Sequence, residues 1–215
     1  MLTNLFFIAL FVFCMILFSM NHGKKKKKVV FFGDMFSELD LQPGGYISWI
    51  TQHLKNEGIE DNYTMVMAVK TGEKIYDLYM QLEEKVLTQE PRIMVMYAGV
   101  HDVWDKYVKG TGTGLQTFEK LFTGIVQKCN AANIKLIVCT PVGWIKPDFD
   151  RQLTAEVDEY ALLMRTIANT YDVHVADLNA ILNEETFVPQ EPLSPLVTAN
   201  KIAGDEVWRI MSFLK

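Results

Sequence analysis

The residues of this chain that could do chemistry stand in the turns that follow short apolar runs. Asp34 follows one such run, and His101 and Asp102 follow another. A base within hydrogen-bond reach of a hydroxyl can activate it as a nucleophile, and His101 has the imidazole for that role. Hydroxyls that could pair with it belong to Ser37 and Ser194. These residue types admit hydrolysis through an activated serine, if the fold brings the groups together.

The same turns also hold ligands that would suit a divalent metal ion. Asp34, Asp102, His101 and Glu191 offer carboxylate oxygens and one imidazole nitrogen. The simpler interpretation is that both aspartates stabilise the turns at their strand ends. The three cysteines form no CxxC pair and give no disulfide framework. We therefore expect no resident metal and no cofactor.

The alternation of apolar runs with helical patterns predicts the elements that position these turns. Runs that are apolar nearly throughout indicate parallel strands covered on both faces, at residues 29–32, 63–68, 93–98, 134–140 and 173–176. Spacing typical of amphipathic helices occupies residues 46–55, 74–88, 115–130, 154–171 and 198–214. Five βα units with right-handed crossovers predict a three-layer α/β/α domain with a five-stranded parallel sheet, flavodoxin-like in outline. Ligands of such folds bind at the carboxyl ends of the strands.

An apolar segment precedes this domain. Residues 2–20 contain no charge, and as a helix they would be about 28 Å long, enough to span a bilayer core. No Lys or Arg precedes the segment and residues 19–22 are a poor cleavage site, which favours an uncleaved anchor over a signal peptide. We therefore divide the chain into a transmembrane anchor at 1–23, a polylysine juxtamembrane linker at 24–28 and a domain at 29–215.

Charge restricts the partners of the domain. The whole chain has a net charge of -5, but residues 29–215 carry 16 Lys and Arg against 26 Asp and Glu. Such an acidic domain lacks the basic surface that nucleic-acid binding uses, so we expect no nucleic acid as a partner. By the positive-inside rule, the lysines at 24–28 favour a single-pass protein whose domain is cytoplasmic.

Several loops carry strings that resemble the SGNH, or GDSL-type, hydrolases. The likeness covers residues 29–215 in order and rests on VVFFGD (29–34), TGE (71–73), YAGVHDVW (97–104) and NKIAGDEVW (200–208). Two further strings, PGGYISWI (43–50) and KIYDLY (74–79), are similar to a bacterial acylhydrolase subgroup. The resemblance implies the α/β/α fold and, in active members, hydrolysis of acyl or acetyl esters.

In active members of that family four groups do the chemistry. A serine attacks the acyl carbon, and a histidine three residues after an aspartate takes the serine proton. The serine N–H, a glycine N–H and an asparagine side chain bind the oxyanion. Carried over to this chain, the serine is Met35, the asparagine is His101, and the aspartate and histidine are Glu191 and Ser194, so that only Gly72 is retained. A thioether cannot be deprotonated, so Met35 cannot act as the nucleophile.

The distribution of histidines supports the loss of the base. The chain has four, at positions 22, 53, 101 and 174, so none lies in the C-terminal loop where the family places its base. We expect His53 to lie on the solvated face of a helix, and His174 to be packed in a strand or exposed at its edge.

We therefore expect a membrane-anchored pseudoenzyme with the SGNH fold, acting as an interaction or scaffold subunit of a membrane-associated assembly. One alternative is an active esterase or acylhydrolase with a rearranged site. Another is a vestigial module that binds a glycan or a lipid, for which Trp104, Trp144 and Tyr107 could line a cleft. The side of the membrane stays open, because the lysines favour the cytoplasm whereas anchored relatives of this kind are often exported.

Overall fold

The structure is a computed structural model that describes residues 26–36, 39–143, 151–182, 187–188 and 192–214. Among these residues, no helix is both long enough and apolar enough to cross a membrane. The anchor expected at 1–23 lies outside them, so the membrane span stays a prediction.

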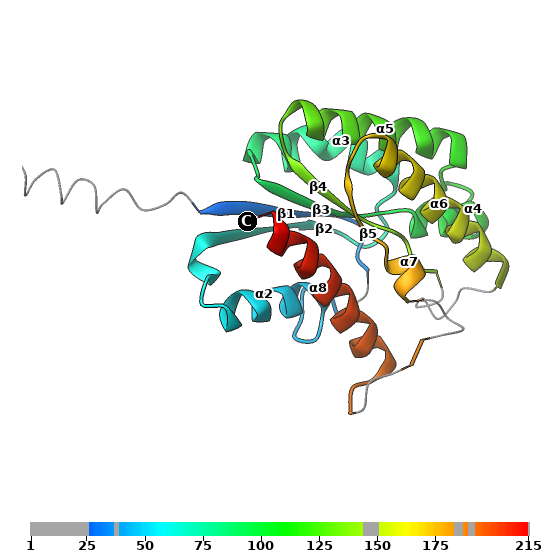
Figure 1. Cartoon of the computed structure of the whole chain (residues 1–215). Helices are drawn as coiled ribbons and strands as arrows, with labels where there is room; N and C mark the ends of the chain where they lie inside the picture. The colour runs from blue at the N-terminus through cyan, green and yellow to red at the C-terminus, as the bar shows by residue number, and fades with distance from the viewer. Residues whose placement is uncertain (1–25, 37–38, 144–150, 183–186, 189–191, 215) are drawn as a thin grey trace, which may run out of the picture.

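Five parallel strands form the centre of the molecule (Figure 1). Their order across the sheet is β2-β1-β3-β4-β5, and their bounds are Lys27–Gly33 for β1, Tyr63–Val69 for β2, Ile93–Tyr97 for β3, Lys135–Cys139 for β4 and His174–Ala176 for β5. All five residues of the central strand β3 are buried. The prediction of a five-stranded parallel sheet is confirmed.

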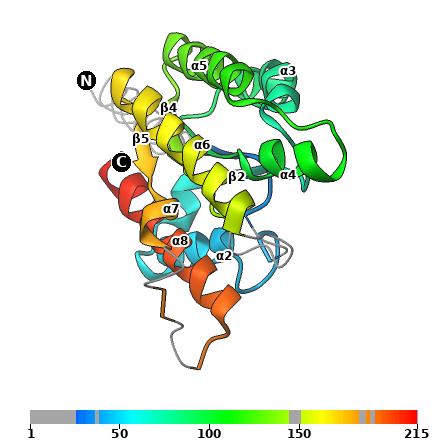
Figure 2. The ribbon, with the colours of Figure 1, turned by 90° about the vertical axis from the view of Figure 1, so that its right-hand side faces the viewer.

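Helices cover both faces of this sheet (Figures 1 and 2). On one face α2 (Tyr46–Asn56) packs against α8 (Pro195–Phe213). On the other face lie α3 (Ile75–Lys85), α4 (Val100–Val108), α5 (Leu115–Ala131) and α6 (Arg151–Thr170). Shorter elements are α7 (Leu178–Ile181) and two 3-10 helices, η1 (Glu60–Asn62) and η2 (Leu87–Gln89). The three-layer α/β/α arrangement is therefore present.

Two local predictions need correction. The sequence indicated no helix over residues 100–108, where α4 lies, because two of its buried positions are the aspartates Asp102 and Asp105 and the apolar period is broken. The linker expected at 24–28 is shorter than predicted, since Lys27 and Lys28 belong to β1 and pair with the first residues of β2. Strand pairing, which a single-sequence pattern does not reveal, extends β1 into the lysine run.

The turn after β1 depends on a glycine. Gly33 has a φ of +123°, and an added Cβ would lie 2.1 Å from the carbonyl oxygen of Tyr97. This close approach lets the Asp34 N–H donate to the same oxygen at 2.9 Å, which fixes the turn against β3. Only glycine tolerates both the backbone angle and the contact.

We predict that Gly33→Ala will destabilise the protein strongly, because it combines a strained φ with a backbone overlap. The free energy of unfolding in urea should fall by roughly 3 kcal/mol or more. Gly58→Ala is the matched control, since Gly58 has a φ of +65° but an added Cβ would meet nothing within 4 Å. The control should lose only about 1 kcal/mol, and equal losses would contradict the role of the overlap.

Candidate functional site

The carboxyl ends of β1, β2 and β3 bring together most of the residues that the sequence singled out. The turn after β1 carries Asp34 and Met35, the turn after β2 carries Thr71 and Gly72, and α4, which begins directly after β3, carries His101. Parallel strands end at one edge of a sheet, so these three segments meet there. We call these five residues the strand-end site.

The carboxylate of Asp34 is hydrogen-bonded to all three segments. Its Oδ1 accepts from the backbone N–H of Met35 at 2.8 Å and from that of Gly72 at 3.0 Å. Its Oδ2 lies 2.5 Å from Nδ1 of His101. Asp34 is fully buried, and a buried carboxylate is costly without such partners. The fold therefore depends on keeping these contacts together.

These three donors stand at the positions that, by the family resemblance, would bind an oxyanion. Met35 takes the serine position, Gly72 the glycine position and His101 the asparagine position. Here each of them hydrogen bonds to a carboxylate that the protein itself supplies. An oxyanion hole acts by presenting donors already aimed at the substrate, and in this structure those donors are engaged by Asp34.

The sulfur of Met35 takes part in a contact between two turns. Met35 is partly buried, and its Sδ accepts a hydrogen bond from the Thr71 hydroxyl at 3.0 Å. A thioether is only a weak acceptor, so the contact contributes mainly packing. The position that the family uses for its nucleophile has a structural contact here.

His101 is held by Asp34 in a fixed orientation. It stands in the first turn of α4, and 15% of its side chain is exposed. A carboxylate on Nδ1 is also how catalytic triads orient their histidine, which leaves Nε2 for proton transfer. Within the described residues, no hydroxyl lies within hydrogen-bond distance of that nitrogen. Among the residues that the structure describes, the pair thus resembles two members of a triad whose nucleophile position is not filled.

Asp102 points away from the strand-end site. Its carboxylate oxygens lie 3.1 and 3.2 Å from the backbone nitrogen of Ile75, which donates to them from the start of α3. Burial raises the pKa of Asp102 to about 7, while hydrogen bonds from Thr113 and from the Ile75 N–H oppose the rise. Asp102 therefore ties α4 to α3.

Asp105, one turn further along α4, has the opposite electrostatic setting. Lys109 and Lys74 place their ammonium groups 3.0 and 3.3 Å from its carboxylate oxygens. Burial acts to raise the pKa of Asp105, but these two ion pairs outweigh it and lower the pKa below the ordinary value. The pKa values of two aspartates on one helix are therefore shifted in opposite directions.

The metal site considered from the sequence does not assemble among the described residues. Asp34 and His101 meet, but Asp102 binds the backbone of α3, and Glu191 lies outside the described part of the chain. Within that part, no three His, Cys, Asp or Glu side chains are grouped so that they could hold a metal ion. The sequence could not show that Asp34 pairs with His101 while Asp102 binds the backbone of α3.

The last predicted site residue, Ser194, has a structural role. It is the N-cap of α8, where its Oγ accepts a hydrogen bond from the Val197 N–H at 3.3 Å. This is the usual way in which a serine stabilises a helix start. Ser37, the other hydroxyl considered as a nucleophile, lies outside the described residues.

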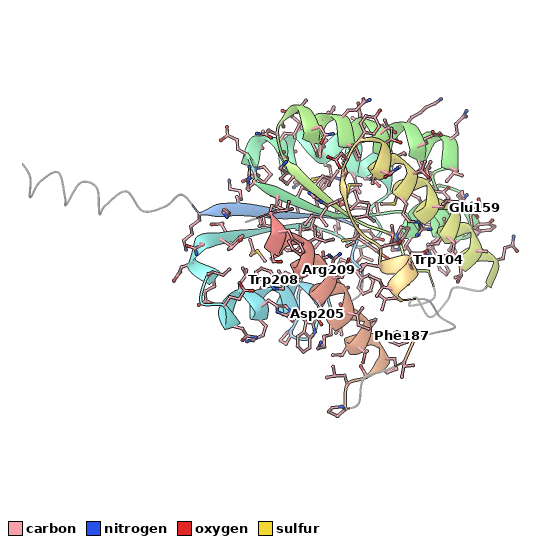
Figure 3. The ribbon with its side chains drawn as sticks, viewed as in Figure 1. Trp104, Glu159, Phe187, Asp205, Trp208 and Arg209 are labelled. Carbon is pink, nitrogen blue, oxygen red and sulfur yellow. The ribbon has the colours of Figure 1, made fainter. Side chains whose placement is uncertain are left out.

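The aromatic residues considered as a cleft lining have packing partners. Trp104 is partly buried against the core (Figure 3), and the Tyr107 hydroxyl donates to Oε2 of Glu156 at 2.7 Å. Trp144 lies outside the described residues. The core contact of Trp104 favours packing over ligand binding, whereas Tyr107 is 55% exposed and bonds to Glu156 at the surface.

The expectation for His53 was wrong. Its ring stacks on Trp208 with the centroids 5.7 Å apart, and its Nε2 lies 2.7 Å from Oδ1 of Asp205. Both partners lie along α8 (Figure 3). Helical spacing around residue 53 could not reveal partners more than 150 residues away. His174 is exposed at the start of β5, one of the two outcomes expected.

Comparison with known proteins identifies the family. The model of the GDSL-like lipase/acylhydrolase family matches residues 31–196. This match covers well over half of the chain, so the chain belongs to that family. The resemblance found in the strand-end loops is thereby confirmed.

Acetylxylan esterases are among the similar proteins. One from Geobacillus stearothermophilus is 24% identical over 144 residues, and the match spans 65% of this chain and 65% of that relative, a little under two thirds. The crystal structure of the acetyl xylan esterase AlAXEase is similar with a TM-score of 0.73 and 31% identity, over 85% of this chain and 98% of that one. Axe2, an acetylxylan esterase from Geobacillus stearothermophilus, has a TM-score of 0.72 at 21% identity, over 87% and 95% of the two chains, and shows the fold alone.

Crystal structures of Axe2 mutants name residue types that are catalytic in that enzyme. Three of its crystal structures are of catalytic mutants, in which a serine, an aspartate or a histidine is replaced by alanine. These residue types form the serine–histidine–acid arrangement of hydrolases. At the positions assigned to them from the sequence motifs, this chain has Met35, Glu191 and Ser194.

We predict that Asp102→Asn will change how stability depends on pH. The pKa of Asp102 is about 7 in the folded protein, against an ordinary value of 3.8. Between these values the unfolded chain gives up the proton and the folded protein keeps it, so the free energy of unfolding should fall as pH rises from about 4 to 7. Asparagine cannot ionise but still accepts from the Ile75 N–H, so urea unfolding across this range should show a flatter profile.

Asp105→Asn is the matched control, because the pKa of Asp105 is shifted in the opposite direction from that of Asp102. Because its pKa is lowered in the folded protein, the ion pairs of Asp105 stabilise the fold above the ordinary aspartate pKa, and this stability is lost as pH falls through the folded pKa. The variant should be less stable than the parent at neutral pH by about 1 kcal/mol and should approach it in acid. An unchanged pH profile for Asp102→Asn would contradict the raised pKa.

Proposed function

We propose that this chain is a non-hydrolytic member of the GDSL-like family, tethered to a membrane by its N-terminal apolar segment and acting as an interaction subunit of a membrane-associated assembly. The proposal has two parts, the loss of ester hydrolysis and the use of the retained domain for binding. The strand-end site supports the first part, and the structural contacts that the domain has kept support the second.

The engagement of the oxyanion donors by Asp34 is the observation that carries the first part. A tetrahedral intermediate would need the N–H groups of Met35 and Gly72 and a donor at position 101. All three make hydrogen bonds of 3.0 Å or less to a fully buried carboxylate. A substrate oxyanion would have to compete with that carboxylate, and the two negative charges would repel each other.

The nucleophile and its base are missing from their family positions as well. Met35 offers no ionisable group, and Ser194 is the N-cap of α8. A rearranged esterase would have to use His101, the imidazole of the strand-end site, to activate either water or the Ser37 hydroxyl. Its Nε2 could remove a proton, but the donors that would stabilise the resulting oxyanion are those engaged by Asp34.

The retained parts of the domain support a binding role. Asn200, which is buried, accepts from the Tyr46 N–H at 3.0 Å and donates to the Leu196 carbonyl at 2.9 Å, and so joins α8 to the start of α2. Gly33 and its close contact with Tyr97 are retained in the same way. A chain under no constraint would be expected to lose such contacts together with the catalytic residues.

A second candidate is recognition of an acetylated carbohydrate without hydrolysis. The similarity to acetylxylan esterases favours this ligand class. A cavity of about 750 Å³ lies beside α2, lined by residues 40–44, by Trp49 and by polar side chains of α2 including Gln52. Aromatic and amide side chains suit sugar binding. This cavity contains none of the strand-end residues, so such binding would use a different surface from the one that active family members use for chemistry.

An ester-hydrolysis assay on the detergent-solubilised full chain tests the first part. With p-nitrophenyl acetate and longer acyl esters, we expect the rate to stay within about twofold of buffer. Met35→Ser should not restore activity, because the C-terminal loop supplies no histidine. Turnover more than about tenfold above buffer that is lost in His101→Ala would overturn the proposal in favour of a rearranged esterase.

Two binding measurements test the second part. Affinity capture of the tagged full chain from solubilised membranes should yield a protein partner in constant stoichiometry that survives gel filtration. Calorimetric titration with acetylated xylooligosaccharides is the competing measurement, with deacetylated oligosaccharides as the matched control. A chain that elutes without partners and binds the acetylated ligand would replace the interaction role with carbohydrate recognition.

A further inference from the structure

A row of basic residues begins three neighbouring strands at the end of the sheet opposite the strand-end site. The Arg92 N–H donates to the Lys28 carbonyl at 2.8 Å, and the Lys135 N–H donates to the Arg92 carbonyl at 3.0 Å. Lys28 belongs to β1, Arg92 immediately precedes β3, and Lys135 opens β4. Neighbouring strands are about 4.8 Å apart, so backbone bonding gathers three basic residues at one end of the sheet. By the strand register, the side chains of Lys28 and Arg92 lie on one face and that of Lys135, which pairs with Ile93, on the other. We call Lys28, Arg92 and Lys135 the basic row.

Two members of this row, Arg92 before β3 and Lys135 in β4, have no side-chain partner among the described residues. Arg92 and Lys135 are both exposed, and within the described part of the chain neither side chain forms an ion pair or a hydrogen bond. Lys28, by contrast, is partly buried and donates through Nζ to the Gln89 carbonyl at 2.6 Å. The row therefore has one anchored member and two whose charges face solvent.

A cavity of about 360 Å³ lies along the same end of the sheet. Its basic lining residues are Lys26, Lys27, Lys28 and Arg92, and Glu90 is its acidic one. Lys27 lies over the ring of Tyr63, and Lys26 is 3.5 Å from the exposed carboxylate of Asp61. Four cations against one anion in the lining make this cavity suited to a phosphate group, which lysine and arginine bind well.

This end of the sheet carries the basic row together with the exposed acids Glu60, Asp61 and Asp172 of the segments before β2 and β5. Residues 29–215 carry 26 acidic against 16 basic residues, so most of the surface would repel an anion. A cationic row on an acidic domain gives the molecule a preferred orientation toward an anionic surface. The chain enters β1 at this same end, directly after the lysine run and the apolar residues 2–20.

We propose that the basic row docks the domain on the phosphate headgroups of an anionic lipid membrane and holds the sheet end-on, with the strand-end site on the far side. The occupant is a lipid surface because the apolar segment and lysine run join the domain here. The proposal rests on the membrane tether of the proposed function, and does not depend on the loss of hydrolysis. Each basic residue close to an anionic bilayer strengthens binding by about fivefold, and salt screens the effect.

The length of the sheet gives the geometric consequence. Strand β1 has seven residues and is therefore about 23 Å long, so docking at its start keeps Asp34 and its neighbours at least that far from the headgroups. A ligand of the strand-end site would approach from the aqueous side.

Spin labels at the two ends of α5 test this orientation in the full chain. One label is placed by Ala132→Cys, just after α5, and the other by Gln116→Cys, in its first turn; both positions are exposed. Cys14→Ala removes the thiol of the apolar segment, while Cys129 and Cys139 are buried. The protein is placed in vesicles of phosphatidylcholine alone or with about one third phosphatidylglycerol, and collisions with a water-soluble nickel chelate are measured by power saturation.

In the anionic vesicles we expect collisions at position 132 to fall at least about threefold relative to neutral vesicles, and to recover in high salt. Collisions at position 116 should not change. Arg92→Gln/Lys135→Gln should abolish the difference, whereas Lys120→Gln/Arg209→Gln, which removes the same charge from elsewhere, should preserve it. Inorganic phosphate added to neutral vesicles should produce no change, which distinguishes a lipid surface from free phosphate.

Vesicle flotation of the same samples separates the two possible failures. Floating protein whose position 132 is equally accessible in both lipids would overturn the docking while leaving the tether intact. Protein that does not float would overturn the tether, and the docking with it. Loss of the effect in the Lys120→Gln/Arg209→Gln control would also overturn the proposal, because it would show that net charge and not the basic row decides the orientation.

Discussion

The buried carboxylate of Asp34 is the interaction on which the strand-end site depends. It has no contact with solvent and accepts from two backbone N–H groups while pairing with one imidazole. A charge in such a place must keep its partners, because an unpaired buried carboxylate costs several kcal/mol. Asp34 therefore holds three segments together, because each of them supplies one hydrogen bond to its carboxylate. These segments are the turn after β1, the turn after β2 and the first turn of α4.

This constraint explains how catalytic residues could be replaced without loss of the fold. The backbone donors of Met35 and Gly72 are satisfied whatever side chain follows Asp34, because the carboxylate accepts from the peptide and not from the side chain. Methionine at position 35 then needs only to pack, and the Thr71 hydroxyl meets its sulfur. Position 101 needs a donor toward Asp34, which an imidazole provides. In the proposed function, the substitutions remove the means of hydrolysis, while the hydrogen bonds to Asp34 hold the three segments together.

The sheet could be predicted from the sequence because each strand contains a short apolar run, which is fully buried in the central strand β3 and only partly buried in the edge strands β2 and β5. Helix α4 could not, since Asp102 and Asp105 are buried there, and their partners Ile75 and Lys74 lie on another element. The meeting of Met35, Gly72 and His101 at the strand ends could be predicted from the order of the motifs, whereas their assignment to catalytic positions stays a prediction. The hydrogen bond from the Gly72 N–H to Asp34 could not be predicted, because it joins residues 38 positions apart. The sequence indicated only that Asp34 stabilises its own turn.

A parallel sheet gives the domain two chemically different ends, because every strand begins at one edge and finishes at the other. At the carboxyl ends the acids Asp34, Asp102 and Glu73 are buried, and burial raises the pKa of both Asp102 and Glu73. At the amino ends Arg92 and Lys135 remain exposed. A raised pKa favours the neutral form of a carboxyl group, so Asp102 and Glu73 add less negative charge at the first end than free carboxylates would. The exposed cations at the second end attract an anion. In the proposed docking, the anionic surface meets the end where the chain enters the sheet, and a ligand of the strand-end site approaches from the aqueous side.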